Sequence, residues 1–358
     1  MRSKVAVLTT TPATVLSDYA RLMRMADYKQ YLPADLDILV KLNLSWTKYF
    51  PSCSSQPWQL DGVIRTLLSD GYKREQILPV ENKTVVTNPV KGARNNLWAG
   101  ILDGSGLPFI PLPEVEWETH EFKEKLLKLD TIFPEGIVIP KMFMGKSVLH
   151  LPTVKTHGHS VTTGAVKNAF GGLLREVRHY AHKYIHEVLV DLVIMQKELH
   201  PGQFCVMDGT VCGDGAGPRT MIPKIRNIIL AGGDPVAVDA VAAKIMGFDP
   251  LSIPYIRMCH DRGLGTGDPQ EIELAGEDIQ EMNFGFKTKR SLVIWGDQML
   301  RIGFLRSLER ILLKSPLVFW APMASNFYHD FLWYPTVGRH RIRSFQKSSW
   351  GRLWKTYK

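Results

Sequence analysis

The chain has few cysteines and lacks any long uncharged apolar run. Its four cysteines are too sparse and too unevenly spaced for a disulfide framework or a paired zinc ribbon. No window reaches the roughly 18 apolar residues that a membrane-spanning helix needs. The opening MRSKVAVLTTT also lacks the apolar core of a secretory signal. We therefore expect a folded protein of the reducing cytoplasm.

Most of the chain also lacks an excess of charge of either sign. Residues 1–300 hold 33 basic and 33 acidic side chains, whereas residues 301–358 hold 11 basic ones against Glu309 and Asp330. The net charge of +9 therefore belongs to the C-terminal segment. Because nucleic-acid-binding proteins usually carry a basic face, this balance argues against a nucleic-acid partner for the main body.

The segment 301–358 also holds 12 of the 35 aromatic residues. Aromatic and basic residues together are typical of a segment that lies on an anionic membrane surface. The same composition suits a strap that packs on the core while its charges stay in water, and it suits RNA less well. We expect a core of residues 1–300 with a basic aromatic extension, docked on that core or peripherally on a membrane.

Short apolar runs alternate with amphipathic stretches along the core. The runs are VAVLTT, LDILVKLNL, QILPVEN, SVLHLP, QFCVMDG and NIILAGG. Strands that alternate with helices predict a three-layer α/β fold, with a mostly parallel sheet flanked by helices. Three prolines in LPFIPLPEVEWE suggest a hinge between two lobes near residues 108–118. In such folds, ligands bind at the carboxyl ends of the strands.

The stretch TVKTHGHSVTTGAVKNAFGG, residues 153–172, places many polar groups at such a strand end. We expect a helix that begins near Val161, with Ser160, Thr162 and Thr163 as caps and with free amides that favour an anion. On that helix, Thr163 and Lys167 would share a face.

In this interpretation Lys155, His157 and Lys167 surround a phosphate or a carboxylate. The alternative is a capped helix with solvated lysines and one buried, hydrogen-bonded histidine.

A glycine-rich stretch, MDGTVCGDGAGP, covers residues 207–218. It predicts a tight turn after a strand, in which backbone amides are exposed and Asp208 or Asp214 faces a ligand or a cation. The glycine spacing matches neither the dinucleotide fingerprint nor the P-loop. The alternative is a turn that only reverses the chain.

Three histidines, His179, His182 and His186, fall on one stripe of a predicted helix. His182 and His186 have the spacing of two metal ligands; the alternative is a partly exposed helix face. His179 is also a candidate anion contact, together with Arg175 and Arg178.

The stretch GGDPVAVDAVAAKIMG, residues 232–247, predicts a helix with Asp234 as N-cap and Pro235 at its first position. Asp239 lies on the small, apolar face of this helix and needs a partner there. The sequence leaves open a salt bridge with a lysine in the core or a role in the ligand site.

Five motifs in order, VKLN, KTH, TGAVKNAFG, DGTVCGDGAGP and GGDPVAVDAVAAKIMG, resemble the family called domain of unknown function 362 over residues 35–270. The resemblance implies that shared polar residues line one cleft. Many relatives carry clustered CxxCxxC cysteines and are described as iron–sulfur proteins. Because such cysteines are missing here, we expect no iron–sulfur cluster.

Together these patterns predict an enzyme that acts on a small anionic metabolite. Proton transfer next to a carboxylate and metal-assisted phosphoryl hydrolysis both suit the residues. The expected catalytic residues are Lys155, His157 and Lys167. The expected binding residues are Lys41, Asn43, Thr163, Asn168, Arg178, His179, Gly215 and Gly217. The candidate ligands of a divalent metal are Asp208, Asp214 and Asp239, with His182 and His186.

A second hypothesis is a non-catalytic module. It would hold a cofactor or a lipid-linked precursor and dock on a membrane through residues 301–358.

Overall fold

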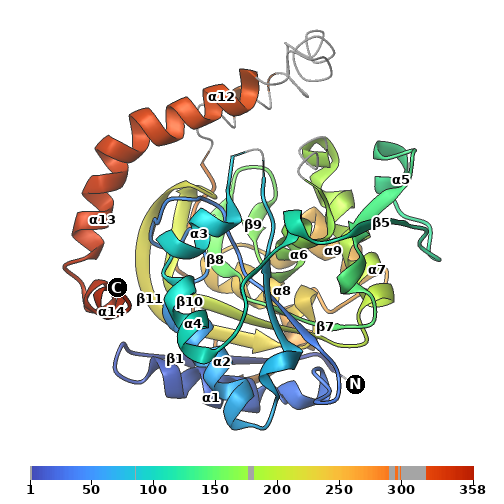
Figure 1. The fold of residues 1–358 in the computed structure, drawn as a ribbon, viewed down its shortest axis with the longest axis horizontal. Helices are drawn as coiled ribbons and strands as arrows, with labels where there is room; N and C mark the ends of the chain where they lie inside the picture. The colour runs from blue at the N-terminus through green and yellow to red at the C-terminus, as the bar shows by residue number, and fades with distance from the viewer. Residues whose placement is uncertain (1, 85, 176–180, 290–294, 297–298, 300–319) are drawn as a thin grey trace.

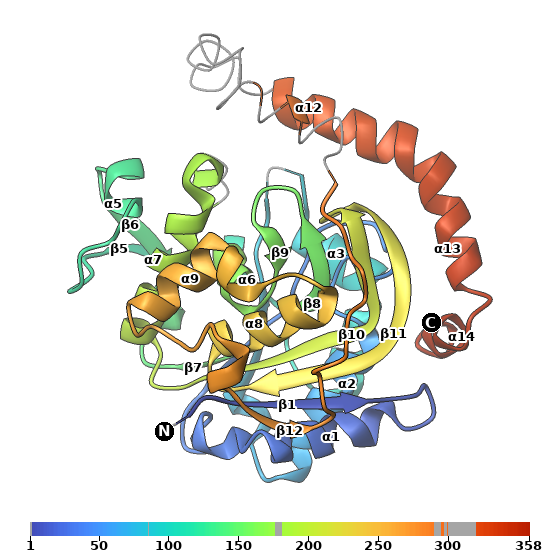
Figure 2. The same ribbon diagram turned by 180° about the vertical axis from the view of Figure 1, so that it is seen from behind.

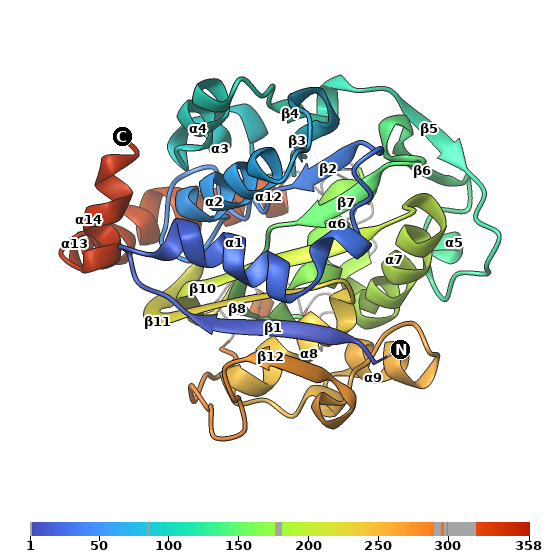
Figure 3. The same cartoon turned by 90° about the horizontal axis from the view of Figure 1, so that it is seen from below.

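The computed structural model describes residues 2–84, 86–175, 181–289, 295–296, 299 and 320–358 (Figure 1). A mixed sheet runs through the molecule in the order β12-β1-β11-β10-β7-β2-β3-β4, with β8 added along β10 and β9 along β8. Helices cover both faces of this sheet (Figures 1 and 3). The predicted three-layer α/β fold is confirmed.

All six predicted strands form. The strands of the sheet are β1 (Lys4–Thr9), β2 (Ile38–Lys41), β3 (Ile77–Glu81), β4 (Ile110–Pro111), β7 (Ser147–His150), β8 (Thr153–His157), β9 (Val161–Thr163), β10 (Gln203–Ala216), β11 (Thr220–Gly232) and β12 (Glu273–Gly276). Parallel pairs join β4, β3, β2, β7 and β10, and β11 runs antiparallel between β10 and β1. Such strands are buried on both faces, which explains their continuous apolar runs.

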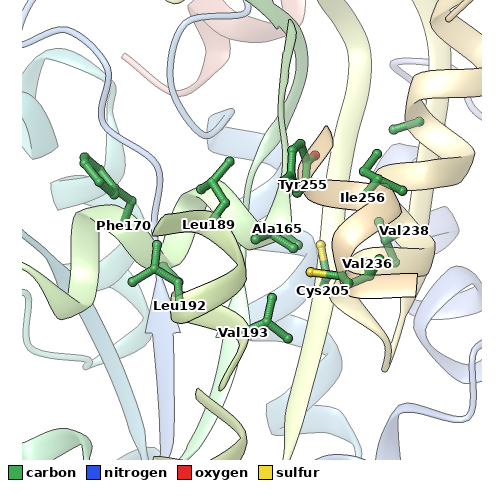
Figure 4. Packing of buried hydrophobic residues seen from close by; sticks show 14 of the residues in the cluster. Ala165, Phe170, Leu189, Leu192, Val193, Cys205, Val236, Val238, Tyr255 and Ile256 are labelled. Carbon is green, nitrogen blue, oxygen red and sulfur yellow. The ribbon is translucent and has the colours of Figure 1, made fainter. Parts of the chain in front are cut away.

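The helices divide between the two faces. One face carries α1 (Val15–Met25), α2 (Pro57–Ser69), α3 (Pro89–Asn95) and α4 (Trp98–Ser105). The other carries α6 (Ala165–Leu173), α7 (Ile185–Leu199), α8 (Pro235–Met246) and α9 (Pro254–Asp261), and Figure 4 shows the apolar side chains that these helices pack together. Beside them, β5 (Trp117–His120) and β6 (Ile137–Pro140) form a separate antiparallel pair near the short α5 (Leu129–Ile132).

Helix α8 begins and ends as its sequence predicts. The Asp234 carboxylate accepts hydrogen bonds from the amides of Val236 (2.9 Å) and Ala237 (3.2 Å), and Pro235 occupies the first helical position. Gly247 ends the helix with a φ of 100°, a conformation that suits glycine. The predicted N-cap is confirmed.

The predicted turn in MDGTVCGDGAGP is confined to its last two residues, Gly217 and Pro218, and is wrong for the rest. These residues continue β10 as far as Ala216 and form a long curved hairpin with β11 (Figure 2). Gly213, Gly215 and Gly217 lie at alternate positions, and the first and last of them let β8 approach closely. A Cβ at Gly217 would lie 1.7 Å from the carbonyl oxygen of Thr156, and one at Gly213 would lie 3.0 Å from Cβ of Lys155.

The predicted helix start at Val161 is also wrong. Residues Val161–Thr163 form β9, which pairs with β8 so that Thr163 lies opposite Lys155. Helix α6 begins four residues later, at Ala165. Thr163 and Lys167 therefore do not share a helix face.

The C-terminal segment forms a continuous helical rod followed by a short helix. The rod consists of α12 (Trp320–Asn326), the π-helical η10 (Phe327–Gly338) and α13 (Arg339–Phe345), and α14 (Ser349–Thr356) follows. It arcs along the outer side of the β10–β11 hairpin (Figures 1 and 2). In the part of the chain that the structure describes, no helix combines the length and the apolar character needed to cross a bilayer.

This segment packs on the core through its aromatic residues. Trp350 is fully buried, its Nε1 donates to Oδ1 of Asn227 at 2.7 Å, and its ring centroid lies 5.0 Å from that of Trp58. The ring of Trp354 stacks on Tyr49 at 4.4 Å. The predicted aromatic strap is therefore confirmed for these residues.

Candidate functional site

Two strand ends bring Lys41 and Glu81 together in the interior. Their strands, β2 and β3, are parallel neighbours, so both side chains emerge at the same edge of the sheet. Nζ of Lys41 lies 2.8 Å from Oε1 of Glu81, and both side chains are almost fully buried. Gly171 and Gly172 of α6 leave room for the lysine, because a Cβ at either would lie 3.3 Å from its terminal atoms.

Lys155 is buried among neutral oxygens. Its Nζ donates to Thr153 Oγ1 (2.7 Å), to the carbonyl of Cys53 (3.0 Å) and to Oδ1 of Asn43. Among the described carboxylates, none lies within ion-pair distance of this amine. Burial lowers the pKa of Lys155 to about 8. This amine can therefore gain and lose a proton near neutral pH.

Asn168 of α6 connects the two lysines. Its Nδ2 donates to the backbone carbonyl of Lys41 at 3.0 Å and lies 3.3 Å from Nδ1 of His150. Its Oδ1 accepts from Asn43 Nδ2 at 3.4 Å, and Asn43 in turn accepts from Lys155. Three residues expected to bind the ligand, Lys41, Asn43 and Asn168, thus form one hydrogen-bonded network with Lys155, which was expected to be catalytic.

His157 lies further along β8 and is held as a neutral imidazole. Its Nδ1 accepts from the amides of His159 (3.1 Å) and Ser160 (3.3 Å), so the proton of the neutral ring resides on Nε2. Burial, and then the nearby Lys167, lower the pKa of His157 well below its usual value. His157 can therefore donate a hydrogen bond from Nε2 at neutral pH.

Partly exposed groups surround this buried network. The ring of His159 lies 5.8 Å from that of His157 and 5.4 Å from that of His182. Lys167 lies over the ring of Phe170 at 5.3 Å. We call the set Lys41, Asn43, Lys155, His157, Lys167 and Asn168 the lysine edge.

The start of α6, predicted to hold an anion, is already occupied by a carboxylate of the protein. Asp239 accepts from the amides of Ala165 (2.7 Å) and Val166 (3.2 Å), and the hydroxyl of Tyr255 donates to it at 3.1 Å. A Cβ at Gly164 would lie 1.9 Å from Asp239 Oδ1, so glycine is needed there. The partners of Asp239 are therefore two backbone amides and the hydroxyl of a tyrosine. The salt bridge between Asp239 and a lysine, which the sequence left open, is wrong. Burial raises the pKa of Asp239 to about 7.

The other two aspartates expected to bind metal have different surroundings. Asp208 accepts from Tyr19 (2.6 Å) and Trp58 (3.0 Å), on the face of the sheet that α1 and α2 cover. Burial raises its pKa to about 6. Asp214 accepts from the amide of Lys287 (2.9 Å). The three aspartates do not form one site.

The two described histidines expected to bind metal also have different neighbours. The ring of His186 stacks on Tyr255 at 6.1 Å, whereas His182 contacts His159 and Phe170. Over the described residues, no three metal-ligating side chains gather closely enough to hold an ion.

Two further residues expected to bind the ligand, Arg178 and His179, lie outside the described residues. Gly215 lies over β8, where its carbonyl accepts from Thr156 Oγ1 at 2.9 Å.

Sequence reasoning missed two members of this network. Glu81 ends β3 inside QILPVEN, and His150 ends β7 inside SVLHLP. Nε2 of His150 lies 2.6 Å from Oε1 of Gln196, and burial lowers the pKa of His150 to about 3. The rule that identified Lys41, a polar residue at the carboxyl end of an apolar run, would have identified both.

A pocket of about 630 Å³ lies at the opposite, amino-terminal edge of the sheet. Its lining includes Tyr31, Lys197, His200 and Asp234. The carboxylate of Asp234 is already engaged by the start of α8 and by the hydroxyl of Ser3 (2.6 Å). We favour the lysine edge as the functional site, because two buried amines lie there and that of Lys155 has neutral oxygens as its partners among the described residues.

The comparisons with known proteins agree with the sequence motifs of this chain. Residues 38–244 match the family model described as domain of unknown function (DUF362). The thylakoid-associated protein sll1697 of Synechocystis sp. is 30% identical over 247 residues, which cover 68% of this chain and 71% of that protein. No solved structure matches the chain. The matched range contains the strand ends of β2, β3, β7 and β8 that build the lysine edge, and the chain belongs to the DUF362 family.

Proposed function

We propose that the protein is an enzyme that binds a small carboxylate or phosphate at the lysine edge and moves a proton on it. The observation that carries this proposal is the buried Lys155 amine, whose partners among the described residues are neutral oxygens and whose pKa is lowered to about 8. A buried cation without a carboxylate partner costs stability unless an anion joins it. A ligand anion would supply the missing charge.

The proposed proton transfer uses Lys155 and His157. Near neutral pH the pKa of about 8 leaves part of the Lys155 amine unprotonated. This neutral amine takes the proton from the carbon next to the ligand carboxylate, and the electron pair of the broken C–H bond remains on the ligand as an enolate. His157 donates a hydrogen bond from Nε2 to the oxygen that gains charge. Lys167, which is partly exposed beside His157, holds the outer part of the anion.

We also propose that the protein works at the surface of a membrane. The relative from Synechocystis sp. is described as thylakoid-associated, and the C-terminal segment carries the whole charge excess of this chain. A basic segment rich in aromatic residues is attracted to anionic lipids.

The site is tested by ligand binding. Titration with inorganic phosphate and with malonate should raise the unfolding temperature of the wild type but not that of Lys155→Met. The matched control is Lys125→Met, which removes the same charge from an exposed position. If all three proteins respond equally, the lysine edge is not the anion site.

Catalysis is tested by isotope exchange. The wild type, incubated in D₂O with a polar metabolite extract, should add one deuterium to a carboxylic acid with time, as seen by mass spectrometry. Lys155→Met should abolish this exchange and Lys125→Met should retain it. A binding module that holds a cofactor or a lipid-linked precursor would instead show a copurified ligand and no exchange in any variant.

A further inference from the structure

The rod formed by α12, η10 and α13 presents a row of exposed residues at every fourth position. The row is Met323, Phe327, Phe331, Pro335, Arg339 and Arg343, and each of its members is exposed. Met323, Phe327 and Phe331 are 71%, 59% and 69% exposed, and their neighbour Leu332 is 50% exposed. The rings of Phe327 and Phe331 stack at 6.1 Å in the open. We call Met323, Phe327, Phe331 and Leu332 the apolar patch.

The mixed helix geometry keeps this row on one side of the rod. Four residues of an α-helix turn about 40° past a full turn. Four residues of the wider π-helix turn less than a full turn, because its hydrogen bonds span five residues. The π-helical η10 lies between α12 and α13, so the two deviations oppose each other and the row stays nearly straight.

The opposite side of the rod is fixed to the core. Oδ1 of Asp330 accepts from Nε1 of Trp46 at 2.7 Å, and Arg219 donates to Oγ of Ser325 at 3.0 Å. Trp333 packs between Trp46 and Phe50, with ring centroids 6.0 and 5.3 Å away. These contacts bury one face of the rod, so the apolar patch cannot turn inward without breaking them.

Positive charge continues where the apolar patch ends. Along residues 339–358 the exposed charged side chains are Arg339, Arg343, Lys347, Arg352, Lys355 and Lys358. Asp330 is the one acidic residue of 320–358, and it faces Trp46. An anionic bilayer complements both parts, since acyl chains take up the aromatic rings and headgroups pair with the cations.

Resting on the proposed membrane location, we propose that the outward row of the α12–η10–α13 rod is the membrane-binding surface. The apolar patch enters an anionic bilayer, and Arg339 and Arg343 contact its headgroups. The inner face of the same rod holds Trp46 and Phe50. These residues belong to the loop whose Asn43 and Cys53 accept from Lys155, so docking places this loop and the lysine edge behind the rod, on the side of the core that faces the bilayer.

The test is sedimentation of the full-length protein with vesicles. Phosphatidylcholine vesicles that contain phosphatidylglycerol should bind the wild type, and vesicles of phosphatidylcholine alone should bind it at least about tenfold more weakly. Phe327→Ser with Phe331→Ser should weaken binding at least about tenfold. Arg339→Gln with Arg343→Gln should do the same and should abolish the preference for phosphatidylglycerol.

Matched controls replace exposed apolar and basic residues elsewhere on the protein. Met144→Ser with Ile225→Ser, and Lys123→Gln with Lys125→Gln, should bind as the wild type does. If the wild type binds no vesicle, the membrane location fails. If it binds and the serine pair binds equally well, the location survives and this surface is wrong. A dimer that the serine pair dissociates would instead identify a second copy as the occupant.

Discussion

Oδ1 of Asp239 in α8 accepts a hydrogen bond from the amide of Ala165 at 2.7 Å and so caps a helix that lies 74 residues earlier in the chain. The carboxylate occupies the position where an external anion was expected. Because it is fully buried, its pKa rises from 3.8 to about 7. The contact therefore makes the junction of α6 and α8 sensitive to pH.

Asp239→Asn should remove one pH-dependent contribution to stability. The pKa of the folded state exceeds that of the unfolded state, so folding favours the protonated acid. This contribution is fully present below about pH 4 and is lost as the pH rises to about 7. The free energy of unfolding by urea should be measured for both proteins at about pH 5 and about pH 8. Between these two pH values the variant should gain on the order of 2 kcal/mol in stability relative to the wild type. If the difference in unfolding free energy between the two proteins is the same at both pH values, the raised pKa of Asp239 is contradicted.

The two buried lysines should respond differently to removal of charge. Lys41→Met takes the lysine away from Glu81 and should cost about 3 kcal/mol of unfolding free energy, because breaking a buried pair strands a charge. Lys155→Met removes an ammonium that has neutral partners, so its effect should stay within about 1 kcal/mol of the wild type. Chemical denaturation measures both. Equal losses would show that Lys155 has a structural role like that of Lys41.

The strands and much of the lysine edge could be predicted from the sequence. Apolar runs identify buried parallel strands, and Lys41 and Asn43 directly follow such a run, so topology alone brings them near Lys155. The partner of Asp239 could not be predicted, because the contact depends on how α8 packs against α6. The strand through Gly213 and Gly215 could have been predicted, since alternate spacing is a strand pattern. The glycine content suggested a turn more strongly than this spacing suggested a strand.

Gly217→Ala should disrupt the contact between the β10–β11 hairpin and β8. The added Cβ would lie 1.7 Å from the carbonyl oxygen of Thr156, so backbone must move and we expect a loss of about 2 kcal/mol or more in unfolding free energy. Gly104→Ala is the control, because a Cβ there meets nothing within 4 Å inside α4. That change should be neutral or stabilise the protein by up to about 1 kcal/mol. Similar effects of both changes would show that close approach is not what requires Gly217.

Trp350→Ala should show how strongly the C-terminal segment contributes to the fold. Trp350 is fully buried against Trp58 and donates to Asn227, so its truncation leaves a cavity and an unmatched acceptor. We expect a loss of about 3–5 kcal/mol in the free energy of unfolding by urea. Phe331→Ala is the control on the same segment. Its ring is 69% exposed, so the loss should stay below about 0.5 kcal/mol. Comparable losses would mean that the outer row of the rod is packed in solution, and they would also count against a membrane-facing surface.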